Sequence, residues 1–347
     1  MIRINMFSQA NSVQGQGVGS VYSELMRLLQ TRLLDEFYVT ENRYGRADLT
    51  HYHTINPTYF LNSFSPARGR KIGYVHFLPD TLTGSIKLPG FAQKVVGKYV
   101  IDFYKRMDQI VVVNPTFIDK LVAYGLKRDR VRYIPNFVSK TEFYEKTLVA
   151  KNAFRHQLGI PLDQFVVFGD GQVQARKGVG DFAKLAEANL GVQFIWAGGF
   201  SFGKITDGYE DYRKLVANPP ANLRFTGIID RSSLVDYLNL ADLFLLPSYD
   251  ELFPMSVLEA FSCGTPVLLR DLELYEAILD GYYLKGHDVT ALNQVLHQVM
   301  QDKTLLATYR KKAQAASEQY SETHLAEIWR DFYREQYKLG KELGQLK

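Results

Sequence analysis

Short apolar runs alternate with helical patterns from about residue 160 onward, and this alternation limits the possible folds more than any other feature of the chain. The runs resemble strands that are buried on both faces of a parallel sheet, and helices occupy the connections that such strands require. The sequence therefore predicts a doubly wound α/β domain. The predicted strands are residues 165–171, 192–199, 222–227, 242–248 and 265–269, and the predicted helices are 179–190, 209–218, 232–240 and 254–262. Ser232 or Ser233 is the expected N-cap of one helix, and Gly264 the expected end of another.

The first 150 residues follow the same alternation less regularly. Predicted strands are residues 2–8, 36–40, 48–54, 71–77 and 108–114, and a predicted helix spans 21–33. A chain of 347 residues is too long for one ordinary core. We therefore predict two α/β domains, residues 1–150 and 151–321, joined within the polar stretch 134–154. The last segment, residues 322–347, has a helical pattern and could return to the first domain.

Several broad classes are disfavoured by composition. No run of about 18 apolar residues occurs, and the first ten residues lack the cationic start and apolar core of a signal peptide. The single cysteine, Cys263, allows no internal disulfide and suits a reducing compartment. These features predict a protein that stays in the cytoplasm.

Positive charge is concentrated in the first domain. Residues 1–148 hold 20 Lys and Arg against 12 Asp and Glu, whereas the remainder holds 21 against 25. Within residues 68–106, eight basic residues accompany only two acidic ones, and apolar residues from Phe91 to Phe103 fall near helical spacing. This pattern is typical of binding to an anionic membrane, and equally of an ordinary helix that packs on its own domain. Nucleic acid is a weaker interpretation, because no DNA-reading motif, metal finger or stacking platform accompanies the charge.

Two glycine-rich stretches each precede a predicted helix. Residues 15–25 contain Gly17 and Gly19, and residues 168–182 add Arg176 and Lys177 at the turn. Glycines let a backbone approach a phosphate, and a helix N-terminus offers free N–H groups. Two cations beside such a helix suit a diphosphate, although ordinary turns and solvated surface charges give the same pattern.

Three histidines lie on or next to predicted strands. His51 and His53 point to the same side of one strand, but without a third ligand they are more typical of ordinary strand residues than of zinc ligands. His76 ends the next strand, where α/β folds place their sites, and a structural role is an equal alternative. No Asp-x-Asp and no Gly-x-Ser-x-Gly occurs, so neither a carboxylate pair for a nucleotide-bound metal nor a hydrolase elbow is indicated.

The stretch DELFPMSVLEAF, residues 250–261, contains two glutamates separated by a proline. Pro254 suits a helix start, so Glu251 should lie in the loop after strand 242–248 and Glu259 in the second helical turn. Loops at the carboxyl ends of parallel strands bind the ligands of α/β proteins. Glu259 could then accept two hydroxyl donors of a ribose and Glu251 those of a sugar, while amides near Phe253 and Met255 could face a diphosphate. A favourable charge near a helix N-terminus is the alternative for Glu251.

Taken together, these stretches resemble the family 4 glycosyltransferases. Residues 240–269 contain the family's Pro-Ser-x-x-Glu, Glu-Ala and Gly-x-Pro-Val elements, with the two glutamates in Glu-x7-Glu spacing. GQGVGSV, IPNFV, GQVQARKG and TGIID resemble its other landmarks in the same order. The resemblance implies a GT-B fold: two Rossmann-like domains facing across a cleft, with a C-terminal helix, about 322–347, that crosses back to the first. It also implies retaining transfer from a nucleotide sugar without an obligate metal, where Mg²⁺ would at most stimulate without a defined site.

The resemblance also implies roles for single residues. Glu259 would hold the ribose diol, Glu251 the donor sugar, Lys177 the β-phosphate, and His76 would lie near the reacting centre. Further donor contacts would come from Gly17 or Gly19 at the diphosphate, Ile229 beside the uracil, and the backbone around Phe253, Pro254 and Met255. In mechanism, Lys177 and Arg176 would stabilise the departing UDP, and neither glutamate would be the general base.

Three positions depart from the family pattern. Gln172 stands where the family has an arginine, and we expect Arg176 to replace that cation. Leu252, Phe253 and Pro254 stand in place of Gly-Phe-Gly, and Phe137 replaces a glycine. The detailed sugar contacts therefore stay open.

Within the family, residues 73–90 and 168–182 look like those of bacterial enzymes that glycosylate diacylglycerol. This implies a peripheral enzyme on the inner face of the cell membrane that moves a hexose, galactose from UDP-galactose, onto glucosyl-diacylglycerol. The alternatives are transfer of glucose from UDP-glucose to diacylglycerol and a soluble polysaccharide glycosyltransferase. From another class, a membrane- or nucleic-acid-binding protein with a vestigial fold remains an alternative.

Overall fold

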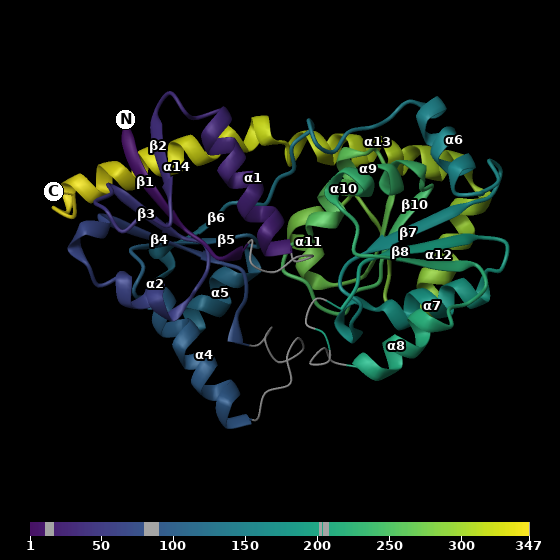
Figure 1. Ribbon diagram of the computed structural model, residues 1–347, viewed down its shortest axis with the longest axis horizontal. Helices are drawn as coiled ribbons and strands as arrows, with labels where there is room; N and C mark the ends of the chain where they lie inside the picture. The colour runs from purple at the N-terminus through teal and green to yellow at the C-terminus, as the bar shows by residue number, and fades with distance from the viewer. Residues whose placement is uncertain (11–16, 80–89, 201–202, 204–207, 347) are drawn as a thin grey trace. The chain divides into compact units, whose positions relative to one another are not determined.

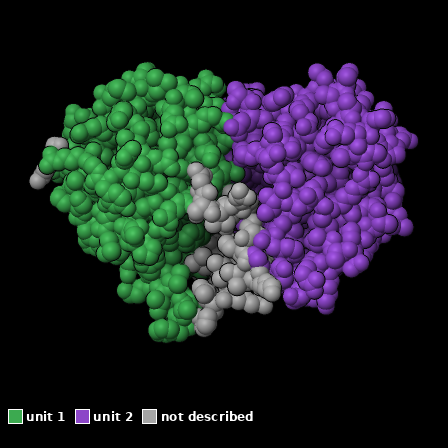
Figure 2. Space-filling view, in the orientation of Figure 1, with its two compact units in different colours: residues 1–84, 88–137, 322–347 green, residues 85–87, 138–321 purple. Residues whose placement is uncertain are grey.

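The computed structural model describes residues 1–10, 17–79, 90–200, 203 and 208–346 (Figure 1). The chain divides into two compact units (Figure 2). The first unit comprises residues 1–84, 88–137 and 322–347, and the second comprises Val138–Ser321. Each unit has its own sheet and its own core, as the alternation of strands and helices predicts.

The first unit is built on a six-stranded sheet in the order β2-β1-β3-β4-β5-β6, in which every neighbouring pair is parallel. Its strands are β1 (Ile2–Phe7), β2 (Phe37–Glu41), β3 (Leu49–Tyr52), β4 (Arg70–Val75), β5 (Gln109–Val112) and β6 (Val131–Tyr133). Strand β6 has only three residues, which is too short for an alternating or apolar pattern to stand out, and the sequence did not predict it.

Helices cover both faces of this sheet. They are α1 (Gly17–Thr31), α2 (Pro57–Asn62), α4 (Gly90–Lys105), α5 (Thr116–Ala123) and α14 (Glu322–Glu342). On β3, His51 bonds to Tyr333 of α14, whereas its neighbour Tyr52 packs edge-on against Phe103 of α4. Because neighbouring strand residues point to opposite faces, α14 and α4 lie on opposite sides of the sheet. The segment after residue 321 therefore belongs to the first unit.

The second unit repeats the architecture with the order β12-β11-β10-β7-β8-β9, again with every described pair parallel. Its strands are β7 (Val166–Asp170), β8 (Gln193–Ala197), β9 (Leu223–Gly227), β10 (Leu243–Leu246), β11 (Val267–Arg270) and β12 (Leu284–Gly286). Strands β7, β8, β10 and β11 are buried along their whole length, which is why they are continuous apolar runs in the sequence. The sequence did not predict β12, a three-residue edge strand.

The second unit has eight described helices around its sheet. They are α6 (Leu148–Gln157), α7 (Val179–Ala188), α8 (Tyr209–Ala217), α9 (Arg231–Leu240), α10 (Met255–Ser262), α11 (Glu273–Leu279), α12 (Val289–Gln301) and α13 (Lys303–Gln319). Helix α10 ends before Gly264, whose φ of 69° confirms the expected C-terminal glycine. The prediction that Ser232 or Ser233 caps α9 is wrong. Asp230 caps it and accepts a bond from the Ser233 amide, because the helix begins one residue earlier than its apolar pattern.

The strand order changes direction at one point in each sheet, which is called its switch point. In the first unit this point lies between β1 and β3, and in the second between β7 and β10. Loops at the carboxyl ends of the two strands diverge there and leave room for a ligand. Within the described residues, no helix is both long and apolar enough to cross a membrane.

Candidate functional site

The two loops at the switch point of the second unit carry most of the predicted donor-binding residues. Strand β7 ends at Asp170 and leads through Gln172 into a 3₁₀ turn, η4 (Ala175–Lys177), directly before α7. Strand β10 leads through residues 247–254, which include Glu251, into α10. Because β7 and β10 are neighbours, the fold brings residues about 75 positions apart in the sequence into contact.

Glu251, Lys177 and Arg176 form one buried ionic cluster between these loops. The Lys177 Nζ lies 2.5 Å from Glu251 Oε1, and Arg176 Nη1 lies 3.5 Å from Glu251 Oε2. Arg176 also donates to the Asp250 carbonyl at 2.8 Å, which ties the first loop to the second. The geometry alone therefore shows a carboxylate held by two cations at the carboxyl ends of β7 and β10.

Burial and charge act against each other on Glu251. Its side chain is only 6% exposed, and burial acts to raise the pKa of the carboxyl. The charges of Lys177 and Arg176 outweigh that effect, so the pKa is lowered below its ordinary value. Glu251 is therefore ionised at neutral pH. It can accept hydrogen bonds from hydroxyl groups, but it has no proton to donate as a general acid.

Asp170 is a further carboxyl at this site that the sequence interpretation missed. It ends β7, is nine-tenths buried, and its Oδ1 has no hydrogen-bond partner among the described residues. Burial raises the pKa of this carboxyl, against the opposing effects of the Ser256 hydroxyl and the Lys177 ammonium, while the Glu251 charge raises it further. Its position in the sequence could have predicted this, because an aspartate at the end of an apolar parallel strand lies at the carboxyl edge of the sheet.

Glu259 lies in the second turn of α10, as predicted, and faces a different cation. Its Oε1 is 3.1 Å from Arg231 Nη1, at the start of α9, and Arg231 Nη2 is 3.1 Å from Glu142 Oε2. Burial raises the pKa of Glu259 despite the Arg231 charge. Arg231 therefore shares its positive charge between two carboxylates. This arginine's role was not predicted, because it lies 28 residues from Glu259 in the sequence.

The other predicted donor-binding residues of the second unit lie on the same edge of the sheet. Gln172 follows β7, and Ile229 lies between β9 and α9. Phe253 is buried, and its ring packs edge-on against Tyr320 with centroids 5.5 Å apart. Pro254 is the N-cap of α10, and Met255 is its first helical residue, so the Met255 amide has no acceptor inside the helix.

In the first unit, Gly17 and Gly19 belong to the helix instead of preceding it. Helix α1 begins at Gly17, four residues earlier than the predicted start, and Gly15 and Gln16 lie outside the described residues. Within the part of the chain that the structure describes, a Cβ at Gly17 would meet no atom within 4 Å, so the backbone there is open to an approaching group.

His76 directly follows β4 and contacts a second histidine. Its Nε2 lies 3.0 Å from the Nδ1 of His53, which directly follows the neighbouring strand β3. Burial lowers the pKa of His76 to about 3, so the imidazole is neutral at physiological pH. The sequence indicated both histidines separately but not their contact, which depends on the pairing of β3 with β4.

Comparison with known proteins identifies the family. The model of "Glycosyltransferase Family 4" matches residues 17–142, and that of "Glycosyl transferases group 1" matches residues 150–316. An alpha-galactosylglucosyldiacylglycerol synthase of Streptococcus pneumoniae is 49% identical over 98% of this chain and 91% of its own length. The chain belongs to the family 4 glycosyltransferases.

Other similar proteins are more distant. The processive diacylglycerol alpha-glucosyltransferase of Acholeplasma laidlawii is 29% identical over 58% of this glycosyltransferase and 62% of its own length. Among solved structures, Anabaena HepE in complex with UDP-glucose has a TM-score of 0.78 at 16% identity, over 96% of this chain and all of that one. Sucrose-phosphate synthase from Thermosynechococcus elongatus has a TM-score of 0.78 at 18% identity, over 98% of this chain and all of that one. These structures confirm the predicted GT-B fold.

No group of three or more metal-binding side chains forms a candidate metal site within the described part of this glycosyltransferase. His51, His53 and His76 lie near one another, but His51 is bonded to Tyr333 and His53 to His76.

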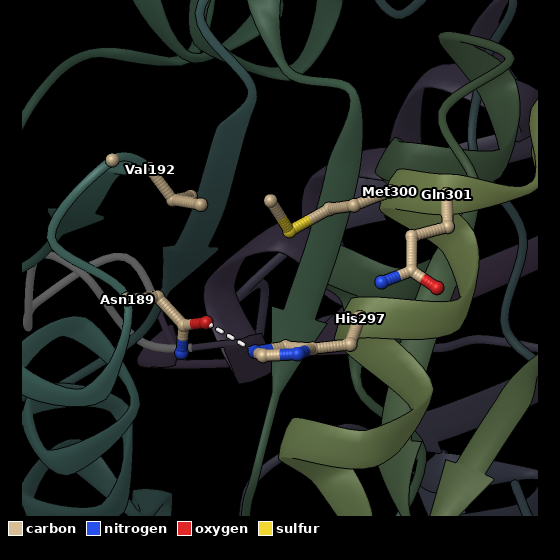
Figure 3. Close-up of a pocket in the computed structure, with 6 residues that line it drawn as sticks. Asn189, Val192, His297, Met300 and Gln301 are labelled. Carbon is tan, nitrogen blue, oxygen red and sulfur yellow. Dashed lines mark hydrogen bonds between the residues drawn. The ribbon is translucent and has the colours of Figure 1, made fainter.

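A pocket lies away from these residues, at the amino end of β8. Its volume is about 280 Å³, and Figure 3 shows the side chains that line it. His297 of α12 bonds there to Asn189, with 2.7 Å between Nε2 and Oδ1. The carboxyl ends of the strands carry the predicted site, so this pocket belongs to the opposite edge of the sheet.

Proposed function

We propose that this glycosyltransferase moves galactose from UDP-galactose onto glucosyl-diacylglycerol and forms a diglycosyl diacylglycerol. The observation that carries the proposal is the 49% identity, over nearly the whole chain, to a protein named alpha-galactosylglucosyldiacylglycerol synthase. Transfer of glucose from UDP-glucose to diacylglycerol is the second candidate, since a more distant relative is named alpha-monoglucosyldiacylglycerol synthase. A UDP-sugar donor is also supported by the fold shared with a protein solved in complex with UDP-glucose.

The second unit would hold the donor through the residues at its switch point. Glu259 would accept the two ribose hydroxyls, Ile229 would lie beside the uracil, and the Met255 amide would face the diphosphate. In the structure Glu259 is paired with Arg231 and buried, so a diol that donates two hydrogen bonds would relieve a carboxylate that burial disfavours. Gln172, at a position where the family resemblance implies an arginine, would contribute only a neutral contact.

Lys177 and Arg176 would neutralise the diphosphate as it leaves. Both cations now bind Glu251, 2.5 Å and 3.5 Å from its oxygens. The three groups suit an arrangement in which the cations bind phosphate and Glu251 binds a sugar hydroxyl. Positive charge already in place where negative charge develops lowers the barrier without reorganisation at the moment of reaction.

Transfer would proceed with retention of the anomeric configuration. The acceptor hydroxyl would attack the anomeric carbon from the face of the leaving group as the bond to UDP breaks. A phosphate oxygen of the departing UDP would take the hydroxyl proton. Glu251 would remain ionised and hold the donor sugar, in line with its lowered pKa. From the first unit, Gly17 or Gly19 would approach the diphosphate and His76 the reacting centre.

Helix α4 would place the enzyme on an anionic membrane. Phe91 is 81% exposed and Val95 53% exposed, one turn apart on the helix. Lys94 and Lys98 are exposed beside them. An apolar strip flanked by lysines can insert between anionic headgroups while the ammonium groups remain at the phosphates. Residues 80–89 of the basic region lie outside the described residues.

The function is tested by offering each donor with each acceptor. UDP-galactose and UDP-glucose are supplied in parallel to liposomes that contain either diacylglycerol or glucosyl-diacylglycerol, and the lipid products are separated. We expect transfer only with UDP-galactose and glucosyl-diacylglycerol. Transfer only from UDP-glucose to diacylglycerol would establish the second candidate, and the absence of any lipid product with all four pairs would refute both.

Membrane binding is tested separately by sedimentation with liposomes of anionic lipid. Phe91→Ser should reduce the bound fraction, because it removes the most exposed apolar side chain of α4. Leu190→Ser is the matched control, since Leu190 is 73% exposed and lies in the second unit outside the basic region. Equal binding of the two variants would exclude α4 as the membrane contact.

A further inference from the structure

The contact between His53 and His76 joins a buried residue to a predicted site residue. His53 is fully buried, whereas His76 is partly exposed. Their ring nitrogens are 3.0 Å apart and their ring centroids 4.3 Å apart. Tyr74 stacks on His76 at an interplanar angle of 10° and packs against His53 as well. The His76 ring is therefore held from two sides.

A hydrogen bond between two neutral imidazoles needs one donor and one acceptor. Burial lowers the pKa values of both rings, so neither carries a second proton at neutral pH. Two arrangements remain. Either the His53 Nδ1–H donates to His76 Nε2, or the His76 Nε2–H donates to His53 Nδ1.

The remaining nitrogen of His53 decides between these arrangements. His53 Nε2 is buried and has no hydrogen-bond partner among the described residues. If His76 were the donor, the proton of His53 would lie on this nitrogen, and an N–H group would be buried without an acceptor. Such groups are rare in folded proteins because they forfeit a hydrogen bond to water. The first arrangement leaves only a bare lone pair at His53 Nε2.

We propose that His53 is a positioning residue that donates from Nδ1 to His76 Nε2 and thereby fixes His76 as the Nδ1–H tautomer. His76 Nδ1 then offers an N–H donor to the reacting sugars. This inference rests on the proposed function, in which His76 approaches the reacting centre. It specifies which nitrogen of His76 carries the proton and names His53 as the residue that determines this. Residues around metal sites orient histidine ligands in the same way, through a hydrogen bond to the second ring nitrogen.

Three variants separate positioning from mere packing. His53→Leu removes the donor, whereas His53→Asn places an amide N–H near the position of Nδ1. His51→Asn is the matched control, because His51 is also fully buried in the same strand region but bonds to Tyr333 instead of His76. All three should unfold at lower temperature than the wild type, since each alters a packed side chain.

Activity should distinguish the variants where stability does not. We expect His53→Leu to lower kcat roughly 10- to 100-fold with little change in the KM for the donor. His53→Asn should recover most of the loss, and His51→Asn should retain wild-type kcat. A wild-type kcat for folded His53→Leu would overturn the proposal, and so would a loss in His51→Asn as large as that in His53→Leu.

A second readout requires no substrate and so remains valid if the proposed function fails. Protein labelled with ¹⁵N-histidine is examined by NMR, with His76→Gln used to assign the His76 ring signals. The wild type should show His76 protonated at Nδ1 and unprotonated at Nε2, and His53→Leu should lose this preference. A His76 ring protonated at Nε2 in the wild type would overturn the proposal whatever the enzyme transfers.

Discussion

Mild acid should destabilise the first unit selectively. His51 and His53 are fully buried in its core, and burial lowers the pKa of His51 to about 3 and that of His53 well below its ordinary value. In the unfolded chain both rings have the ordinary pKa of about 6.5 and take up protons below it. The stability that these histidines contribute is therefore present above pH 6.5 and lost as the pH falls below that value.

The size of the loss follows from the same difference in proton binding. At pH 5 each buried ring stays neutral in the native state but is almost fully protonated in the unfolded chain. This difference lowers the free energy of unfolding by about 2 kcal/mol for each histidine. The two buried histidines together should cost the first unit about 4 kcal/mol between pH 7 and pH 5. The free energy of unfolding of a domain is only about 5–15 kcal/mol, so we expect the first unit to open partially at pH 5.

The second unit should respond in the opposite direction. Burial raises the pKa values of Asp170 and Glu259 above those of the unfolded chain. Each carboxyl therefore binds its proton more readily in the native state, and the penalty for burying its charge falls as the pH decreases toward 5. The two units should differ in acid stability even though they share one architecture.

Hydrogen exchange read by mass spectrometry can follow the two units in one sample. Protection is measured at pH 7 and pH 5 and corrected for the intrinsic effect of pH on exchange. Peptides from β3 and β4 should lose protection at pH 5, while peptides from β7 and β10 should not. His51→Asn should reduce the first unit's loss by about 2 kcal/mol, and His287→Gln, which changes an exposed side chain of the second unit, should leave it unchanged. Equal protection of β3 and β4 at both pH values would refute the reasoning.

Three substitutions in the second unit test the ionic cluster of Glu251, Lys177 and Arg176 and the nearby Asp170 carboxyl. Lys177→Ala should weaken UDP binding and lower turnover at least tenfold, because it removes a cation from the diphosphate; calorimetry and initial rates check this, and an unaffected variant would exclude Lys177 from the site. Glu251→Gln should lower kcat by a factor roughly 10 to 100 times larger than the factor by which it weakens UDP binding, because UDP lacks the hexose that Glu251 would hold; an equal loss of UDP affinity would place Glu251 elsewhere. Asp170→Asn should raise the free energy of unfolding of the second unit by about 1 kcal/mol at pH 8, because it removes a buried charge. A lower free energy of unfolding in urea denaturation would contradict the raised pKa of Asp170.

The sequence predicted those parts of the fold that are repeated in its pattern. Strands β7, β8, β10 and β11 were visible because each is buried on both faces, and α10 because Pro254 and Gly264 mark its ends. Strands β6 and β12 were missed because three residues carry no readable periodicity. The fold was thus predictable where apolar burial is continuous, and less so at the sheet edges.

Contacts between side chains were predictable only in part. The sequence predicted that Glu251 and Lys177 follow the carboxyl ends of parallel strands, but their contact depends on the neighbouring positions of β7 and β10, which the structure supplied. Two contacts depend on side-chain rotamers and strand register, which the local sequence pattern does not predict. They are the pairing of Arg231 with Glu259 and that of His53 with His76. Asp170 could have been found from its place at the end of an apolar strand.

Helix α14 links the order of synthesis to the order of folding. Its Trp329 and Tyr333 are fully buried in the first unit, and Tyr333 supplies the partner of His51. The strands that they cover are made early, but α14 is synthesised only after the whole second unit. Until then, one face of β3 and β4 lacks its cover and exposes apolar surface. The second unit can therefore finish folding before the first, although it is synthesised later.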